Sequence, residues 1–492
     1  MENAVAPAEI RSLRTKIFYG LGSIAYGVKD NGFQTILLPF YNLVLHVPAH
    51  LVGLAIFIAL MFDAFVDPII GHFSDNLNTR WGRRHPLMYA SALPVAVSYL
   101  LLWNPPHWSP DALFVYLIVV AIVVRTFITF YEIPSSALVP ELTSDYDERT
   151  SFIGYRVFFA WYGALVMLVL AFLVFMGPSP PPGSCEPAGQ LHAEGYARYG
   201  MVAAVVMFVA IIVSAAGTHR FIPYFRKPEA AQRSLWQYVR EMFQSLSNRA
   251  FLILLAALIF FNLANGLVFA LNFYVNTFFW KLNNAQIGVL SMSLFIAVAF
   301  GFSVALPMSR WLGKKLSAIL MFASGYLLSS APLLLGLMGV LPVQPSPTIV
   351  AILFVAAVIG SGLAIGSSVM VVSMIADVVE DSEIETGRRS EGLFFAGNSF
   401  MQKAASGLGL FVSGIILAAV GFPTGTMPCA VDPQIVRNFC IVYFATVCVT
   451  YTIGFVLIAM FPISRQSHAD NLKKLAGAAG EFLVDEPPGP TN

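Results

Sequence analysis

Residues 51–73 read LVGLAIFIALMFDAFVDPIIGHF, an apolar run interrupted by only two carboxylates, Asp63 and Asp67. A transmembrane helix needs about 20 consecutive, mostly apolar residues, so this run is long enough to cross a bilayer. Directly after it come polar residues and the basic sequence RWGRR (80–84). Long apolar runs of this kind, separated by short polar stretches, recur along the whole chain and predict a polytopic helical membrane protein.

The composition supports this class. The chain has 492 residues, of which 57% are apolar and 11% charged, with a mean hydropathy of +0.73. The charged fraction is less than half of the roughly 25% found in soluble domains, and the runs are too long and uniform for barrel strands. We therefore predict an all-α fold with twelve spans, near 17–45, 51–73, 86–104, 111–138, 152–177, 199–216, 250–280, 287–309, 317–339, 349–378, 392–420 and 437–462.

The spans divide six and six around a long polar connection. We expect an N-terminal bundle (1–216), a central loop with an amphipathic helix (217–249), a C-terminal bundle (250–462) and a tail (463–492). The loops echo each other: NTRWGRRHP (78–86) follows the second span and SRWLGKKLS (309–317) follows the eighth. Such repeats are typical of transporters whose site lies between the two halves near the membrane midplane.

Basic residues predict the orientation. With the N-terminus inside, 21 of the 28 Lys and Arg residues fall in inner segments, 3 in outer loops and 4 within spans. Positive charge is retained on the cytoplasmic side. We therefore expect a cell-membrane protein with both termini in the cytoplasm. The net charge of +1 says nothing about partners, and no basic patch with interleaved aromatic residues suggests nucleic acid.

Eight ionisable residues lie within the spans, four acids and four bases: Lys29, Asp30, Asp63, Asp67, Arg125, Glu132, Arg156 and Lys403. Each costs about 2.5–3.5 kcal/mol at the centre of a membrane helix. They must therefore pair with one another or line a wet cavity. Ion pairs that only fix helix packing are the simpler alternative to a functional site.

Asp63 and Asp67 are four residues apart and share one helix face. Two neighbouring carboxylates do not both stay ionised in a low dielectric unless a cation lies between them; otherwise one takes a proton. Pro68 lacks an N–H, so the carbonyl of Ala64 loses its helical partner. Carboxylates, a hydroxyl such as that of Thr129 and free carbonyls are ligands for a small cation such as sodium, and a proton remains the alternative.

Seven motifs together carry a resemblance to a known family: KD (29–30), DAFVDPIIG (63–71), TRWGRRHP (79–86), TFYEIPSSALVP (129–140), GYR (154–156), ETGRRSEG (385–392) and QKAASG (402–407). The chain resembles the glycoside–pentoside–hexuronide:cation symporters, the melibiose-permease-like branch of the major facilitator superfamily. The resemblance implies twelve helices in two six-helix bundles and transport by alternating access.

The resemblance also implies roles for individual residues. The cation-binding positions are Asp63, Asp67 and Thr129. The substrate-binding group is Lys29, Asp30, Glu132 and Arg156, with Lys403 beside the cation site. The cytoplasmic gate is Asp75, Arg80, Arg83, Arg84 and Arg388.

The sequence departs from the melibiose-permease pattern at four positions. Val66 stands where that pattern has asparagine, Glu132 where it has aspartate, and Ser136 where it has tryptophan, and Arg125 is an extra charge. The first change removes a cation ligand and leaves sodium or proton coupling open. The third removes an aromatic platform for a sugar ring.

Two cysteines in outer loops, Cys185 and Cys429, either form a disulfide or are free thiols. The pair is also similar to the sodium-dependent lysophosphatidylcholine symporters, which makes an amphipathic anion the alternative substrate.

We therefore expect a monomeric, cation-coupled symporter of a sugar or glycoside, with no cofactor and no metal beyond the transported ion. A sensor that does not transport is a remote alternative. An enzyme is not expected, because the sequence contains no G-x-S-x-G or P-loop motif.

Overall fold

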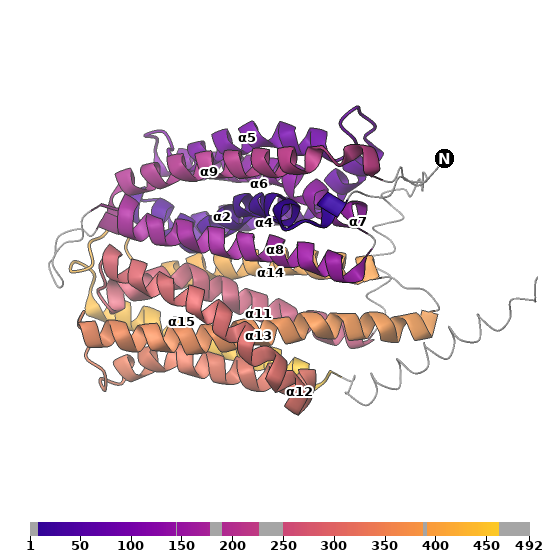
Figure 1. Cartoon of the computed structure of the whole chain (residues 1–492). Coiled ribbons are helices and arrows are strands. Elements are labelled where there is room, and N and C mark those ends of the chain that lie inside the picture. Colours follow the sequence, from indigo (N-terminus) through magenta and orange to yellow (C-terminus); the bar gives the residue numbers. More distant parts are fainter. Residues whose placement is uncertain (1–7, 144, 178–188, 226–248, 387–390, 462–492) are drawn as a thin grey trace, which may run out of the picture.

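The computed structural model describes residues 8–143, 145–177, 189–225, 249–386 and 391–461, and every regular element in these ranges is helical. The helices run side by side along one long direction and form two groups (Figure 1). The N-terminal helices make one group and α11–α15 make the other. The predicted boundaries between the domains remain predictions, because 226–248 and 462–492 lie outside the described residues.

The N-terminal group begins with a helix that is repeatedly interrupted by wide π turns. Its pieces are α1 (Leu13–Leu21), α2 (Ser23–Asn31), η2 (Gly32–Ile36), α3 (Leu37–Pro39) and η3 (Phe40–Val44). The rest of the group consists of α4 (Ala49–Asn76), α5 (His85–Trp103), α6 (Pro110–Ser136), the short α7 (Val139–Leu142), α8 (Tyr146–Leu170) with η4 (Ala171–Phe175), and α9 (Ala193–His219). Short 3-10 turns lie at η1 (Ala8–Arg11), η5 (Gly189–Leu191) and η6 (Ile222–Tyr224).

The C-terminal group contains α11 (Arg249–Tyr274) with η7 (Val275–Phe279), α12 (Asn284–Leu337), α13 (Pro347–Thr386), α14 (Glu391–Ala419) and α15 (Pro433–Ala459). Helix α12 has 54 residues, which at about 1.5 Å per residue is far longer than a hydrocarbon core of about 30 Å. Gly313 interrupts it with φ 78° and ψ 162°, so α12 comprises two successive spans.

The expected twelve spans are present. Ten helices in the described ranges are long and apolar enough to cross a membrane. The break at Gly313 divides α12 and adds an eleventh span. The interrupted helix from α1 to η3 is the twelfth, and it is more polar than those ten because it contains Lys29, Asp30 and Asn31.

The internal repeat is visible in the backbone of the two basic loops. Gly82 has φ 73° and Gly313 has φ 78°. Only glycine adopts this region without strain. Each glycine is followed directly by two basic residues, so the same turn presents two positive side chains in each half.

The halves touch most closely at the end opposite the basic loops. Helix α4 packs along α14 across the interface, and a Cβ added at Gly53 or Gly414 would collide with the backbone of the facing helix. Tyr274 also donates a hydrogen bond to Asn42 Oδ1 at 2.8 Å across the interface. The glycines therefore permit backbone contact that closes this end.

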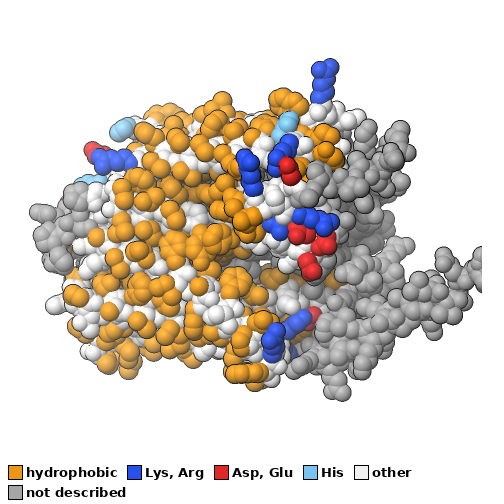
Figure 2. Space-filling model, viewed as in Figure 1, with side chains coloured by type: hydrophobic (Ala, Val, Ile, Leu, Met, Phe, Trp, Pro, Cys, Tyr) orange, Lys and Arg blue, Asp and Glu red, His pale blue; other side chains and the backbone are white. Residues whose placement is uncertain are grey.

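The surface has the charge distribution of a membrane protein. Apolar side chains cover most of the visible face, whereas most charged side chains gather at the end that carries the basic loops (Figure 2). Many large apolar residues are exposed, among them Phe65, Ile69 and Leu93. Soluble proteins rarely expose apolar surfaces of this size to water, so the surface is that of a protein surrounded by hydrocarbon.

Candidate functional site

The charged residues predicted within the spans come together from five helices. Helix α2 carries Lys29 and Asp30; α4 carries Asp63 and Asp67; α6 carries Arg125, Thr129 and Glu132; α8 carries Arg156; and α14 carries Lys403. Of these helices only α14 belongs to the C-terminal half. The site therefore lies mainly in the N-terminal bundle and reaches the other half through one lysine.

Asp63 is fully buried and both of its oxygens are engaged. Oδ1 accepts a hydrogen bond from Thr129 Oγ1 at 2.8 Å. Oδ2 lies 2.9 Å from Arg125 Nη1 and 2.9 Å from Lys403 Nζ. A carboxylate in this position is stable only because two cations and a hydroxyl replace its water.

Asp67 shares two of those partners. Lys403 Nζ lies 2.5 Å from its Oδ2, and Thr129 Oγ1 is 3.2 Å from its Oδ1. A hydroxyl has a single proton, so Thr129 donates to one aspartate at a time, and the 2.8 Å distance favours Asp63. The side chain of Asp67 is 20% exposed whereas that of Asp63 is not exposed. The pair therefore has one sealed and one accessible member.

A second group of charges lies beside the first. Lys29 Nζ is 2.9 Å from Asp30 Oδ1 and 3.8 Å from Glu132 Oε2. Lys29 is buried, but the side chains of Asp30 and Glu132 are 40% and 25% exposed. Arg125 Nη2 lies 3.9 Å from Asp30 and links the two groups. The carboxylates of Asp30 and Glu132 are therefore accessible to a ligand.

Arg156 borders the second group through different partners. Its Nε donates to the hydroxyl of Tyr26 at 3.1 Å, and its guanidinium lies over the Tyr26 ring, 5.2 Å from the centroid. Nη2 approaches the backbone carbonyl of Glu132 at 3.4 Å. The arrangement holds the guanidinium in place without using the carboxylate of Glu132.

The candidate site is electrically neutral, because its four acids and four bases balance. Removing one partner of a buried ion pair costs far more than the pair itself contributes. The eight charges therefore form one coupled set in which a change at one member affects the others.

The predicted gate residues form a separate cluster around a residue that we did not predict, Glu141. Its Oε1 lies 2.5 Å from Arg83 Nη2 and 3.2 Å from Arg84 Nε. Arg84 Nη2 also lies 2.5 Å from Asp75 Oδ1, and its Nη1 donates to Ser74 at 3.0 Å. The basic loop is thereby fastened to the ends of α4 and α7.

Two predicted gate residues do not join that cluster. Arg80 is exposed and has no ion-pair partner in the part of the chain that the structure describes. Arg388 lies outside the described residues. In the other half, Lys314 Nζ lies 2.6 Å from Asp377 Oδ1 on α13, the counterpart of the Arg83–Glu141 contact.

The structure describes one of the two cysteines predicted to form a disulfide. Cys429 is disulfide-bonded, and Cys440 and Cys448 are free. Cys185 lies outside the described residues, so its pairing with Cys429 stays a prediction.

Three neighbours of the site were missing from the predicted set. Arg125 had a signal, since it is one of the eight charges within the spans. Glu141 had a weaker one, as the first acid after the fourth span. Tyr26 had none, because a tyrosine in an apolar helix is an ordinary packing residue.

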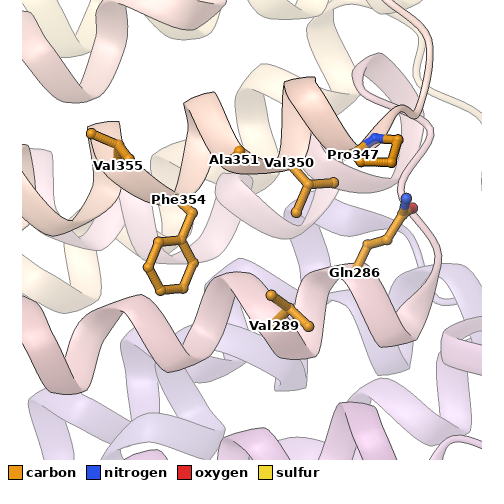
Figure 3. Close-up of a pocket in the computed structure, with 7 residues that line it drawn as sticks. All are labelled: Gln286, Val289, Pro347, Val350, Ala351, Phe354 and Val355. Carbon is orange, nitrogen blue, oxygen red and sulfur yellow. The ribbon is translucent and has the colours of Figure 1, made fainter.

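A surface cavity of about 450 Å³ lies elsewhere, between the first turns of α12 and α13. Its lining is almost entirely apolar, and Phe354 and Val350 of α13 point toward Val289 of α12 (Figure 3). None of the predicted site residues borders it. Its position and composition suit contact with lipid rather than with the charged cluster.

Comparison with known proteins identifies relatives along nearly the full chain. A symporter of Synechocystis sp. (sll1374) is 27% identical, with 95% of this chain and 97% of the relative covered. The isoprimeverose transporter of Lactiplantibacillus pentosus is 26% identical, covering 82% and 80%. Sodium-dependent lysophosphatidylcholine symporter 1 of Xenopus tropicalis is 22% identical, covering 94% and 90%.

The fold has matches among solved structures. The nucleoside transporter NupG (D323A mutant) superposes with a TM-score of 0.62 at 15% identity, covering 92% of this chain and all of that one. This likeness bears on the fold alone. The family model "MFS/sugar transport protein" matches residues 18–465. The chain therefore belongs to this family of multi-pass major facilitator transporters, the group of the glycoside–pentoside–hexuronide:cation symporters, and is not an enzyme.

Proposed function

We propose that the protein is a symporter that couples the uptake of a sugar or glycoside to Na⁺ or H⁺ by alternating access. The observation that carries the proposal is the contact between two groups of charges. One is the pair Asp63 and Asp67 with Thr129, of which Asp63 is sealed, and the other is the partly exposed pair Asp30 and Glu132. Because Arg125 reaches both groups, a change in one alters the electrostatics of the other.

The first group is the proposed cation site. Two carboxylates that each lie within hydrogen-bonding distance of the same hydroxyl are oxygen ligands for a small cation, or carriers of a proton. Lys403 joins this site from the opposite half. Occupation of the site therefore changes the ion pairs that connect the two bundles, as coupling between sites requires.

The second group is the proposed substrate site. Carboxylates accept hydrogen bonds from sugar hydroxyls, while Lys29, Arg156 and Lys403 donate to sugar oxygens. The absence of net charge over the eight residues favours a neutral, hydroxyl-rich substrate over a phosphate-bearing one. The isoprimeverose transporter among the relatives supports this class. A lysophospholipid-like anion is the alternative, supported by the lysophosphatidylcholine symporter.

We propose that Asp75, Arg80, Arg83, Arg84 and Arg388 form the inner gate and that both termini face the cytoplasm. The described halves pack closely at the opposite end, which corresponds to an outer side that is closed. Substrate would then leave past the basic loops.

Reconstituted protein tests the proposal directly. Proteoliposomes are given an inward Na⁺ or H⁺ gradient and a panel of labelled glycosides, with labelled lysophosphatidylcholine as the comparison. We expect at least one glycoside to accumulate against its gradient, and Asp67→Asn to abolish accumulation. Unchanged ion-driven uptake by Asp67→Asn would contradict the mechanism. Accumulation of lysophosphatidylcholine without any glycoside would show that the substrate is a lipid-like anion and not a sugar.

A further inference from the structure

Arg125 occupies a place where a coupling ion would be expected. Its side chain is buried, with 1% of the residue exposed. Nη1 lies 2.9 Å from Asp63 Oδ2, and the guanidinium carbon lies 4.6 Å from the centroid of the Phe33 ring. The guanidinium is therefore the innermost cation at the sealed aspartate.

The negative charge of the two aspartates is already balanced by two positive side chains, so no charge remains for a further cation to neutralise. Asp63 and Asp67 contribute two negative charges, and Arg125 and Lys403 contribute two positive ones at 2.5–2.9 Å. A sodium ion added to this set would make it positive in a low-dielectric surrounding, where an unbalanced charge is strongly disfavoured. Without Arg125 the same set would carry one negative charge, which one sodium ion neutralises.

We propose that Arg125 is a tethered substitute for sodium at Asp63, so that the wild-type protein does not bind Na⁺ at the acid pair. Arg125 is then the residue that sets cation specificity. The proposal rests on the proposed symport and selects between its two candidate ions.

The side chain of Arg125 is held in place more firmly than that of Lys403, which contacts the same aspartate. Phe33 covers one face of Arg125, and Arg125 Nη1 donates to Asp63 Oδ2 at 2.9 Å, which holds the side chain of α6 against the buried aspartate of α4. An arginine also keeps its charge in a protein interior. Lys403 is 21% exposed and more able to leave. Its departure to admit sodium would strand an ammonium group within a membrane helix, which is costly.

The geometry of the ligands agrees with this assignment. The buried oxygens of Asp63 face tethered donors: the hydroxyl of Thr129, the guanidinium of Arg125 and the ammonium of Lys403. Val66, on the same helix turn as the pair, contributes no oxygen. The set is therefore arranged around tethered donors and not around a free cation.

Sodium binding to the purified full-length protein tests the proposal without any substrate. The melting temperature is measured in NaCl and in choline chloride at equal ionic strength. Five proteins are compared: wild type, Asp63→Asn, Arg125→Gln, the charge-retaining control Arg125→Lys, and the double variant Asp63→Asn/Arg125→Gln.

We expect wild type and Arg125→Lys to melt at the same temperature in both salts. Arg125→Gln should gain a sodium-specific, saturable stabilisation, with an apparent affinity at least about a hundredfold above wild type, because one full charge is uncovered a few ångströms away. The double variant should lose this response, since its acid pair is again neutral.

Two results would overturn the proposal. One is a sodium-specific shift in wild type that Asp63→Asn removes. The other is a folded, monodisperse Arg125→Gln that stays insensitive to sodium. The wild-type measurement decides even if Arg125→Gln does not fold. A failure of the proposed symport would show differently, as no accumulation of any glycoside under any ion gradient.

Discussion

The contact between Asp63 and Arg125 should appear as a large coupling energy in a double-mutant cycle. The variants are Asp63→Asn, Arg125→Gln and the two combined. The relative exposures of the two residues are 0% and 1%, and the shortest N–O distance is 2.9 Å. Solvent therefore screens this pair very little.

The expected magnitudes follow from what each variant leaves behind. Asp63→Asn leaves Arg125 and Lys403 to share Asp67, an uncompensated buried cation that should cost about 3–5 kcal/mol. Arg125→Gln leaves Asp63 with Lys403 and Thr129, so we expect a smaller loss of about 2 kcal/mol. The double variant keeps the neutral pair Lys403–Asp67 and should lose only about 1–2 kcal/mol. The coupling energy is then about 3–6 kcal/mol, at or above the upper end for contacting residues.

The assay is reversible unfolding in mixed micelles without sodium, followed by tryptophan fluorescence. The exposed pair Glu194–Arg198, at 3.2 Å with side chains 83% and 59% exposed, is the matched control. Its coupling should stay below about 0.5 kcal/mol. A coupling of that small size for Asp63 and Arg125 would refute the argument, because independent residues contribute additively.

Three further predictions concern the gate and the interface between the halves. Glu141→Gln should lower the free energy of unfolding by about 2 kcal/mol, because the Glu141 side chain is only 7% exposed. Asp75→Asn should lower it by less than about 1 kcal/mol, because the Asp75 side chain is 56% exposed. Equal losses in calorimetry would show that burial does not decide the strength of these ion pairs. Gly414→Val should wedge α14 away from α4, so a cysteine in that interface should react faster with a thiol reagent; an unchanged rate would mean that the helices are not in backbone contact. Tyr274→Phe removes the 2.8 Å bond to Asn42 and should shift the same labelling equilibrium by about 1 kcal/mol, and no shift would show that the bond does not hold the halves together.

The sequence by itself determined the class of fold and the residues that matter. Spans are predictable because a bilayer core sets a minimum length of apolar helix, whatever the neighbouring helices do. Charges such as Asp63 within those spans are conspicuous for the same reason, since each is costly there. Gly313 illustrates the limit, because the loop was predicted as a separate connection whereas the backbone turns there within one residue.

Only the tertiary structure decided which charge meets which. Asp67 and Lys403 are separated by 336 positions in the chain, and no pattern along the sequence predicts that their side chains touch. The same holds for Glu141, which the chain places after the fourth span but whose partners are the arginines that follow the second. Helix spacing predicts which residues share a face, yet pairing depends on how helices pack against one another. The position of Arg125 at Asp63, and with it the proposed exclusion of sodium, therefore follows from the assembly of α4, α6 and α14.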